Sequence, residues 1–598
     1  MTNINQIMSQ DISMSMKRHL IMQECNLNIN EFKKRLVYDK NKLFFENNRV
    51  YNFNGKNVLK IDILTIEEDC ILLEGRTDLS YFIEDCKVFV EDELTGNNIK
   101  VDFCENKAFN QYTEDNEIIF HGWKFSIRLP LENGKYTFVL YDRFSKTNRE
   151  LKPSYGRFAK LTDDFRQNYF YDKGYKINLS GKKFLVTKID KKTRIRTELS
   201  MYKKLLKSNL DHKYQIVFMR VLYQILRCMI KKDIWLISDR AYVAGDNGEA
   251  FFKYAVKQKE IKAYFLIDQS SEDYNRLKTI GKVVKYNSFK HKLIFLLCKK
   301  LISASADGWV FNIMGDEEVY FKDLFKFDYV FLQHGIIQKD FSKWLNKLNK
   351  NISLFVTSAI DEYNSILNGD YGYMDKEVKL TGLPRFDYLK DDAENIISIM
   401  PTWRKYIAAD HVPLAKDSII KVRGYSDSFK ETSYYKFYQG LISNEKLVEL
   451  LNEYNYKIEL YMHPSFAKQS KDFRSISDRI VINEDEINYN SIFKKSALLI
   501  TDYSSVAMDF AYLKKPIIYT QFDKEEFLNN HTGKEGYFDY EEKGFGPVCI
   551  TIEETVEQIE NYLKNSFKMD EKYISRVDEF FAYTDRNNCE RVYKEIKR

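Results

Sequence analysis

The chain has 598 residues, 44% of them hydrophobic and 15% aromatic, which is enough for about three globular domains and excludes an intrinsically disordered chain. Lys and Arg number 93 against 87 Asp and Glu, so the net charge of +6 is small for this length and argues against a nucleic-acid binder. None of the eight cysteines forms a Cys-x-x-Cys pair, which argues against a disulfide framework or a zinc site and favours a reducing compartment.

The sequence contains no apolar run of the roughly 18 residues that a bilayer-spanning helix needs. Its first 20 residues also lack the apolar core of a secretory signal. We therefore expect a cytoplasmic protein. If its substrate is membrane-bound, the protein is expected to be peripheral on the inner face of the cell membrane.

The N-terminal third divides into two segments. Residues 1–44 are polar with weak helical periodicity, and the sequence assigns them no firm structure. In residues 45–190 short apolar runs alternate with turn signals, which predicts a β-sandwich-like accessory domain. This region contains no catalytic constellation, so a structural or docking role is favoured over carbohydrate binding through aromatics such as Trp123. The predicted strands are 58–64, 70–74, 87–90, 117–120, 124–129, 135–141 and 183–187.

A broad apolar stripe at helical spacing follows in residues 216–230, with Lys and Arg on both sides. A basic amphipathic helix can lie on an anionic bilayer, or it can pack on a domain core with its charges in water. The second arrangement is the commoner one and is favoured here.

Strands alternate with helices after residue 232, in two successive blocks that meet near Leu383-Pro384-Arg385. This alternation predicts two doubly wound Rossmann-like domains with parallel sheets, over residues 191–385 and 386–598. Ligands of such sheets bind at the carboxyl ends of the strands. The predicted strands are 234–238, 263–267, 329–332, 354–357, 379–381, 396–400, 457–462, 480–482, 498–501 and 516–519.

Two histidines stand where a predicted strand ends, one in each α/β block. His334 precedes Gly335, which lets the backbone approach a ligand closely, and His463 precedes Pro464. A single histidine in this context is more often a hydrogen-bonded structural residue. Two of them at equivalent places indicate a shared site between the domains, where an imidazole can act as a general base near neutral pH.

A cluster of hydroxyl and acidic residues follows the predicted strand 498–501. Thr501, Asp502, Ser504 and Ser505 lead into a helix, where hydroxyls and free amides form an anion site. Simple N-capping is the plainer interpretation and is compatible with phosphate binding. Asp509, two helical turns after Asp502, is a candidate to orient hydroxyls or a ribose, or else a solvated helix acid.

Three further polar groups follow strands of the α/β blocks. Thr402 and Arg404 end one strand, and the planar guanidinium suits a phosphate. Asp239-Arg240 and Asp246-Asn247 form a loop that enters a helix in the first block. These loops are consistent with an anionic substrate but are weak evidence individually.

Several well-known site patterns are missing from the sequence. No Asp-x-Asp follows a strand of the α/β blocks, so we expect no obligatory catalytic metal and no other cofactor. The sequence has no P-loop, no G-x-G-x-x-G and no G-x-S-x-G, which disfavours an ATPase, a dehydrogenase and an α/β-hydrolase.

Taken together and in order, these motifs resemble the CDP-glycerol glycerophosphotransferase family, the teichoic acid polymerases and primases of bacteria. The resemblance covers about residues 230–560 and leaves the β-rich region out. The matching stretches are Ser238-Asp239-Arg240, Asp246-Asn247, Gln333-His334-Gly335, Thr381-Gly382-Leu383-Pro384-Arg385-Phe386-Asp387, Pro401-Thr402-Trp403-Arg404, His463-Pro464, Thr501-Asp502-Tyr503-Ser504-Ser505 continuing to Asp509, and Lys515-Pro516-Ile517-Ile518-Tyr519.

The resemblance implies an α/β GT-B fold with the CDP-glycerol donor in the C-terminal half. It implies that His334 activates the acceptor hydroxyl and that His463 contacts or protonates the donor phosphates. Ser504, Ser505 and Arg404 would then hold the diphosphate. The expected reaction transfers glycerol phosphate to a lipid-linked or polymeric acceptor of the cell envelope and releases CMP.

Three alternatives remain open from the sequence. The donor can instead be CDP-ribitol or another CDP-polyol, since nothing in the motifs separates them. A nucleotide-sugar glycosyltransferase of the same fold would release UDP or GDP. A non-catalytic surface-attachment protein would have no need of the two histidines or the Thr-Asp-Tyr-Ser-Ser loop.

Overall fold

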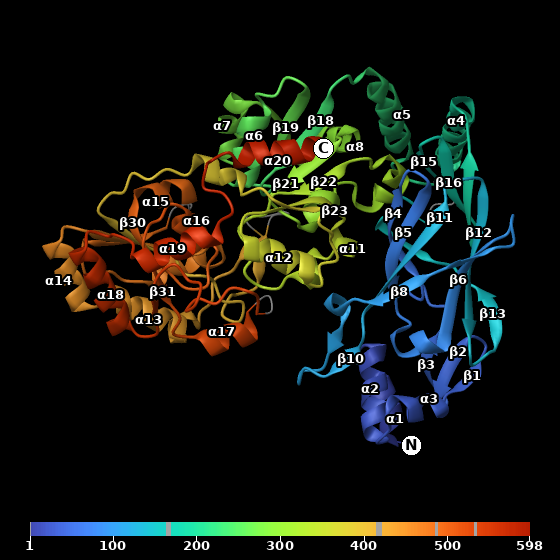
Figure 1. The fold of residues 1–598 in the computed structure, drawn as a ribbon, viewed down its shortest axis with the longest axis horizontal. Coiled ribbons are helices and arrows are strands. Elements are labelled where there is room, and N and C mark those ends of the chain that lie inside the picture. Colours follow the sequence, from blue (N-terminus) through green and yellow to red (C-terminus); the bar gives the residue numbers. More distant parts are fainter. Residues whose placement is uncertain (1, 163–168, 414–420, 485–487, 532–534) are drawn as a thin grey trace.

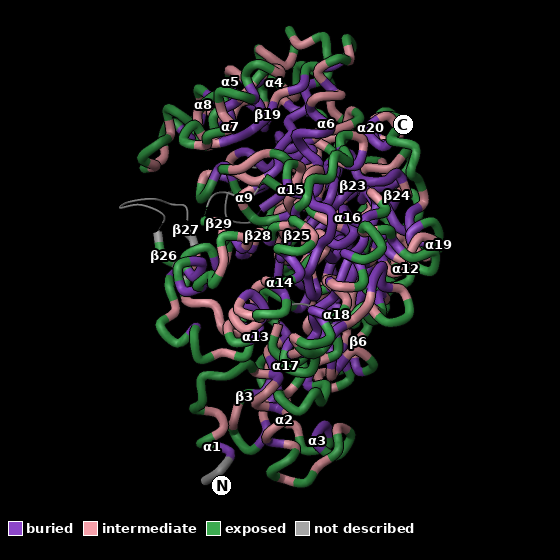
Figure 2. The backbone as a smooth tube through the Cα atoms, turned by 90° about the vertical axis from the view of Figure 1, so that its left-hand side faces the viewer, coloured by how far each residue is buried: buried purple, intermediate pink, exposed green. Residues whose placement is uncertain are grey.

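The computed structural model describes residues 2–162, 169–413, 421–484, 488–531 and 535–598. The chain forms a β-rich N-terminal part followed by two α/β domains, coloured blue to teal, green to yellow and orange to red in Figure 1. Figure 2 shows the buried segments concentrated in the interior of these parts, with exposed loops around them.

The N-terminal part begins with helices where the sequence assigned no structure: α1 (Thr2–Ser9), α2 (Met14–Glu24) and α3 (Ile29–Lys34). Side-chain caps start two of them, because the Ser13 side chain accepts from the amide of Met16 and Asn28 forms a capping box with Glu31. A short sheet then follows, formed by β1 (Val37–Asp39), β2 (Lys42–Phe45) and β3 (Asn48–Asn52).

Two larger sheets follow, and their inward side chains share one buried core. One has the order β14-β4-β5-β11-β8, and the other β15-β16-β17-β12-β6-β7 with β13 beside β12. All seven predicted strands overlap observed ones; the β-sandwich-like packing itself stays a prediction. The strands are β4 (Lys60–Ile66), β5 (Cys70–Thr77), β6 (Cys86–Asp92), β7 (Asn98–Lys100), β8 (Asp102–Glu105), β11 (Trp123–Pro130), β12 (Gly134–Asp142), β13 (Thr147–Glu150), β14 (Ser154–Phe158), β15 (Tyr169–Asp172), β16 (Tyr175–Ser180) and β17 (Lys183–Lys188), with the separate pair β9 (Gln111–Tyr112) and β10 (Ile118–Phe120) and the 3-10 turns η1 (Ser80–Asp85) and η2 (Lys107–Phe109).

A helical hairpin of α4 (Lys191–Lys207) and α5 (Lys213–Met229) joins this part to the first α/β domain. Arg220 fixes it from within: the guanidinium is fully buried and pairs with Glu198 at 2.9 Å and with Asp323 at 2.7 Å. The favoured sequence interpretation, a helix packed on a core, therefore holds for one face of α5. Within the described residues, no helix has the length and apolar content needed to span a membrane.

The first α/β domain contains a seven-stranded sheet of order β20-β19-β18-β21-β22-β23-β24, with every neighbouring pair parallel. Because the chain runs outward from β18 in both directions, the strand order reverses between β18 and β21. The strands are β18 (Asp233–Ser238), β19 (Ile261–Ile267), β20 (Lys282–Lys285), β21 (Lys300–Ser303), β22 (Asp328–Phe331), β23 (Ile352–Thr357) and β24 (Val378–Leu380). The helices are α6 (Asn247–Ala255), α7 (Asp273–Ile280), α8 (Phe289–Leu297), α9 (Gly308–Phe311), α10 (Ser342–Leu345), α11 (Lys347–Lys350) and α12 (Ile360–Asn368), with 3-10 turns η3 (Gly315–Tyr320), η4 (Lys322–Leu324) and η5 (Pro384–Tyr388).

The second α/β domain repeats this plan with a parallel sheet of order β29-β28-β25-β30-β31-β32. Its order reverses between β25 and β30. The strands are β25 (Ile396–Ile399), β28 (Lys457–Tyr461), β29 (Ile480–Asn483), β30 (Ser496–Thr501), β31 (Ile517–Thr520) and β32 (Val548–Cys549), with a separate hairpin of β26 (His411–Pro413) and β27 (Lys421–Arg423). The helices are α13 (Ser433–Ile442), α14 (Glu445–Glu453), α15 (Tyr489–Lys495), α16 (Val506–Tyr512), α17 (Lys524–Asn530), α18 (Ile552–Lys564), α19 (Glu571–Phe580) and α20 (Asn588–Lys597), with 3-10 turns η6 (Phe429–Glu431) and η7 (Pro464–Asp472).

The last helix does not stay with the second domain. Figure 1 shows α20 beside α6 and β19 of the first domain. The Asp387 carboxylate accepts the backbone amides of Asn588 and Cys589, both at 2.8 Å, which holds the start of α20 against η5. Residues 588–597 therefore pack on the first α/β domain, whereas the domain boundary predicted after residue 385 assigns them to the second.

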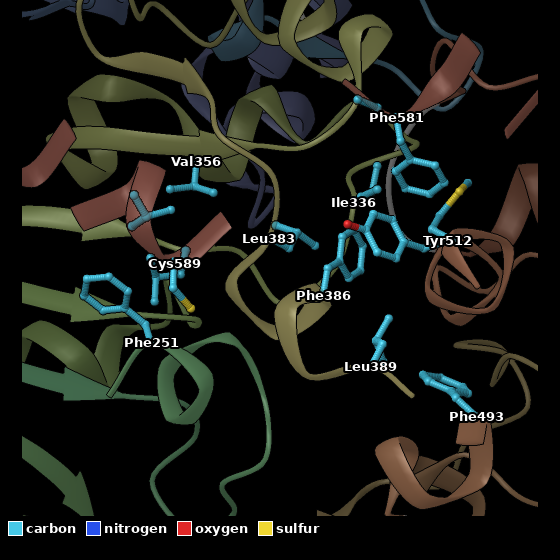
Figure 3. Packing of buried hydrophobic residues seen from close by; sticks show 14 of the residues in the cluster. Phe251, Ile336, Val356, Leu383, Phe386, Leu389, Phe493, Tyr512, Phe581 and Cys589 are labelled. Carbon is cyan, nitrogen blue, oxygen red and sulfur yellow. The ribbon is translucent and has the colours of Figure 1, made fainter. Parts of the chain in front are cut away.

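One apolar cluster runs through both α/β domains at their junction. Figure 3 shows Leu383, Phe386 and Leu389 of the connecting segment between side chains from the two domains. Phe386 stacks on Tyr512 of α16, with ring centroids 4.3 Å apart. The junction is thus part of the core, which fixes how the two sheets face each other.

Replacing Asp387 with Ala should loosen α20, because the buried amides of Asn588 and Cys589 lose their shared acceptor. Hydrogen exchange over residues 588–597 should report an opening free energy lower by about 1–3 kcal/mol. Glu595→Ala, which removes only an exposed pair with Arg598, is the control. Equal exchange in the two variants would show that Asp387 does not anchor the helix.

Candidate active site

The polar loops singled out in the sequence follow the carboxyl ends of the central strands of both sheets. In the first domain Asp239 follows β18 and His334 follows β22. In the second domain Thr402 follows β25, His463 follows β28 and Asp502 follows β30. These places surround the two points of strand-order reversal, which are where open α/β sheets bind ligands.

The imidazole of His334 contacts one acidic and one basic side chain. Its Nδ1 contacts the Asp246 carboxylate, and its Nε2 lies 2.5 Å from Nη2 of Arg240. An arginine can only donate, so Nε2 accepts and the proton of the neutral ring is on Nδ1, directed at Asp246. The side chain is 55% exposed, and a substrate hydroxyl reaches the lone pair of Nε2 only when Arg240 moves off it.

The backbone before His334 is strained, and a buried acid supports it. Gln333 has φ +64°, an unusual value for a residue other than glycine, and its Nε2 donates to Oε1 of Glu362 at 2.9 Å. Glu362 also accepts the amide of Ile337 at 2.7 Å, and burial raises its pKa to about 7. Sequence reasoning missed Glu362, because an acid in the first turn of a helix has no distinctive local pattern.

Arg385 joins the two domains at this site. It forms a two-pronged pair with Asp509 of α16, at 2.5 and 2.7 Å, and it contacts Asp246 and the backbone carbonyl of His334, both at 2.6 Å. Burial acts to lower the pKa of Arg385, but Asp509 and Asp246 outweigh it and raise the pKa. From the sequence, Arg385 is a candidate for the acceptor side or for a loop role, and Asp509 for orienting hydroxyls or a ribose. The structure pairs these two side chains with each other.

The loop after β18 positions the Asp246 carboxylate. Asp239 accepts the amides of Gly248 at 2.6 Å and Glu249 at 3.1 Å, and burial with the nearby charge of Asp246 raises its pKa to about 8. Burial alone would also raise the pKa of Asp246, but His334 and Arg385 hold it below the ordinary value. Asp246 is therefore ionised beside His334, and Asp239 is a supporting residue of the loop.

Asn247 ties this loop to the other two segments of the site. Its side-chain amide donates to the carbonyl of Gln333 at 2.8 Å, and its oxygen accepts the amide of Arg385 at 3.0 Å. Asn247 is fully buried, so it holds the segments together and does not face a ligand.

The second histidine, His463, belongs to the second domain. Burial, together with the charges of Arg240, His334 and His531, lowers its pKa to about 3, so these groups act on one another electrostatically. The amide of Ser465 donates to its Nδ1 at 3.1 Å, which leaves the proton of the neutral ring on Nε2. The charge of His334 thus acts on His463 across the two domains, and a shared site of the two histidines stays a prediction.

Aromatic and basic side chains that the sequence analysis missed lie beside His463. Trp403 stacks on His463 with centroids 6.1 Å apart, and the ring centroid of His531 lies 5.0 Å from that of Trp403. Burial lowers the pKa of His531 to about 3. Lys339, from the segment after His334, places Nζ 3.9 Å from the ring centroid of Phe527, and burial lowers its pKa to about 8. His531 and Lys339 belong to no sequence motif, and they become candidate site residues only through what they contact in the folded chain.

Several predicted phosphate ligands are part of the interior of the second domain. Arg404 is fully buried and pairs with Asp523 at 2.7 Å and with Asp502 at 2.9 Å, so its guanidinium is not free to clamp a phosphate. Thr501 donates its hydroxyl to the carbonyl of Met400 at 2.7 Å. For Arg404, Asp502 and Thr501 a direct donor contact stays a prediction without geometric support.

The other hydroxyl residues predicted to bind phosphate are Thr402, Ser504 and Ser505. Thr402 has a hydroxyl without a hydrogen-bond partner among the described residues, and Ser504 and Ser505 are half-buried. An added Cβ at Gly335 would lie 2.8 Å from the Ser505 hydroxyl, so a side chain at this position would force Ser505 to shift. Among the described residues, no group of three or more His, Cys, Asp and Glu side chains is arranged to hold a metal ion; independence from metal stays a prediction.

Comparison with known proteins identifies the family. The model of the CDP-glycerol:poly(glycerophosphate) glycerophosphotransferase family matches residues 219–598, more than half of the chain. The chain belongs to this glycerophosphotransferase family. The match includes every residue of the site described above.

Several individual proteins, and one solved structure, are also similar to this chain. The minor teichoic acid biosynthesis protein GgaB of Bacillus subtilis is 38% identical over 90% of this chain, which spans 59% of GgaB. The ribitol-phosphate polymerase TarK of Staphylococcus aureus is 27% identical over 38% of this chain and 42% of TarK. A solved structure of the wall teichoic acid polymerase TagF has 17% identity and a TM-score of 0.45, over 68% of this chain and 99% of that chain. The chain thus spans less than two thirds of GgaB and of TarK.

Replacing Arg385 with Met should destabilise the chain by about 3–5 kcal/mol, because the buried Asp509 and the partly buried Asp246 would lose their shared cation. The folded pKa of Asp246 lies below its unfolded value, so its stabilisation is present above an ordinary pKa of 3.8 and is lost as the pH falls below it. The deficit measured by calorimetry should therefore shrink on acidification. Arg240→Met is the control. If Arg385→Met lowered the free energy of unfolding no more than Arg240→Met does, the result would contradict the role of Arg385.

Proposed function

We propose that this chain transfers glycerol phosphate from CDP-glycerol to a hydroxyl of a teichoic-acid-like or capsular cell-envelope polymer and releases CMP. One observation carries the proposal: His334, oriented by Asp246, acts electrostatically on His463 of the other domain. Membership of the glycerophosphotransferase family supports the same reaction class. We further propose that the two α/β domains form a GT-B fold, with the donor in the C-terminal one.

In this mechanism His334 is the general base. Arg240 moves from Nε2 to the donor diphosphate, and Nε2 then takes the proton of the acceptor hydroxyl. The resulting imidazolium is stabilised by the ionised Asp246. The acceptor oxygen forms a bond to the phosphorus nearest the glycerol, and the bond from that phosphorus to the bridging oxygen breaks, so that CMP leaves with the electron pair. Because such transfers depend on positioning and charge, Arg240 and Lys339 are placed to balance the diphosphate.

His463 is proposed to hold the donor as a neutral hydrogen-bond donor. Its low pKa keeps the ring uncharged in the free protein, and its proton is on Nε2. A bound diphosphate would raise that pKa, so the ring can also protonate the leaving phosphate once the donor is in place. Ser504 and Ser505 are the hydroxyl candidates for the same diphosphate.

His334→Ala should lower CMP release by about 100-fold or more, because the general base is lost. His463→Ala should also lower it strongly, whereas His463→Gln should keep part of the activity, since its side-chain amide can still donate a hydrogen bond. CMP release from CDP-glycerol is the measurement, with circular dichroism to confirm folding. Full activity of both alanine variants would end the proposal.

CDP-ribitol is the second candidate donor, because TarK is a ribitol-phosphate polymerase by name. Incubation with CDP-glycerol and CDP-ribitol separately, with CMP as the readout, decides between them. Release of UDP or GDP from a nucleotide sugar would instead indicate an ordinary glycosyltransferase.

We also propose that the chain works at the inner face of the cell membrane, contacting the bilayer through α4 and α5. Tyr214, Phe218, Ile225 and Met229 lie on one face of α5 at helical spacing and are 54–69% exposed. Ile195 and Leu199 of α4 are 60% and 51% exposed. Lysines and arginines flank both helices, as in helices that lie on anionic lipid. A lipid-linked acceptor would be reached from this position.

Replacing Phe218 and Ile225 together with Ser should abolish sedimentation with phosphatidylglycerol vesicles, because about 0.8 kcal/mol is lost for each CH₂ no longer buried in lipid. The full chain should not sediment with phosphatidylcholine vesicles, which lack the negative charge. The matched control is Ile12→Ser with Val37→Ser, two exposed apolar residues of the N-terminal part. Binding that survives in the α5 variant would exclude this surface.

A further inference from the structure

A cavity of about 740 Å³ lies in the N-terminal part, within the range of about 300–1,000 Å³ that is typical of ligand pockets. Its walls come from α2, β3, β4, β5, the turn η2 and the start of β11. Lys343 of α10, in the first α/β domain, completes the lining. The sequence analysis assigned this region a structural or docking role, and the proposed reaction does not use it.

The lining is predominantly basic. Arg18, Arg49, Lys60, Arg76 and Lys343 line the cavity, whereas Asp78 is the acid among the lining residues. Asp62 pairs with both Lys60 and Arg76, at 3.6 and 2.8 Å, so its single charge offsets one of these two cations. The Asp78 carboxylate accepts the hydroxyl of Tyr51 at 2.6 Å. Three cations therefore remain without a described acidic partner.

Arg18 is the most constrained of these three cations. It is only 4% exposed and donates to the carbonyl of Val50 at 3.0 Å and to the hydroxyl of Ser15 at 3.2 Å. Its buried Nε has no hydrogen-bond partner among the described residues. The guanidinium also lies over the rings of Tyr81 and Tyr51, at 4.9 and 5.9 Å from their centroids. Because no described acid forms an ion pair with it, the guanidinium is suited to an anionic ligand.

Aromatic and amide side chains complete the lining. Trp123, Phe109 and Phe120 are half-buried there, so each presents part of a ring to the cavity. Asn52 and Gln111 add groups that both donate and accept hydrogen bonds. Aromatic faces bind the apolar faces of sugar rings, and amides bind hydroxyl groups. The lining thus combines features for a hydroxyl-rich ligand with features for a negatively charged one.

The cavity is connected to the segment that carries His334. Lys343 follows His334 along the same stretch of chain, and α10 packs against η2. Arg76 donates to the side-chain oxygen of Asn349 at 3.0 Å, which fixes the N-terminal part on the first α/β domain. A chain held in the cavity would therefore be anchored on the domain that contains the proposed general base.

We propose that this cavity binds a segment of the growing acceptor, an anionic chain of sugar or polyol units joined by phosphodiesters, behind the end that reacts. The identity of that chain rests on the proposed function. Arg18, Arg49 and Lys343 bind its phosphates, and Trp123 contacts its sugar or polyol units. A second site of this kind keeps the acceptor bound between successive additions.

The test is calorimetric titration of the full chain with synthetic oligo(glycerol phosphate), and separately with an oligomer of glucose units joined by phosphodiesters. At least one should bind, more weakly as salt is raised, and a neutral dextran oligosaccharide should not compete. Arg49→Ala with Lys343→Ala should lower that affinity about tenfold or more, because two charge-assisted contacts are lost. Lys87→Ala with Lys146→Ala, exposed lysines of the same part outside the cavity, should leave it unchanged.

The same variants separate this proposal from the proposed function. CMP release with a single-unit acceptor should be equal in the wild type and in the Arg49/Lys343 variant, while the rate with the oligomeric acceptor should fall. Absence of CMP release from the wild type would refute the proposed reaction without touching the binding result. The cavity proposal is overturned if neither oligomer binds, if dextran competes equally, or if the cavity variant binds as the control variant does.

Discussion

The site depends on one buried cation shared between two domains. Arg385 stands in the segment that joins the α/β domains, and it binds Asp509 of the second and Asp246 of the first. The same guanidinium has little capacity for another partner, because it already donates to two carboxylates and to the carbonyl of His334. Its position sets the position of Asp246, Asp246 orients His334, and the proposed base is thereby aimed at the domain that carries His463.

Sequence reasoning located the central strands and both histidines because these are local signals. A short apolar run followed by a polar loop marks β22 and β28 without knowledge of the rest of the chain. The same reasoning missed two strands, β20 at the edge and β21 at the centre of the first sheet, because each contains only two consecutive apolar residues. It also left α1 to α3 unassigned, although the Asn28 capping box was legible.

The roles of the charged residues could not be predicted, because pairing is a property of the folded chain. Arg404 and Arg385 were both candidates for a ligand, yet both are used by neighbouring carboxylates. His531, Lys339 and Glu362 carry no local motif and become candidates only through what they approach. The return of α20 to the first domain is equally non-local, since it depends on contacts with distant residues such as the acceptor Asp387.

The most direct test is a crystal structure of the chain with CDP-glycerol bound. The account predicts the diphosphate between the two domains, with Nε2 of His463 within hydrogen-bond distance of a phosphate oxygen. It also predicts Nε2 of His334 facing the phosphorus nearest the glycerol from the side opposite the CMP. A donor bound on one domain alone, with His334 turned away from it, would contradict the account.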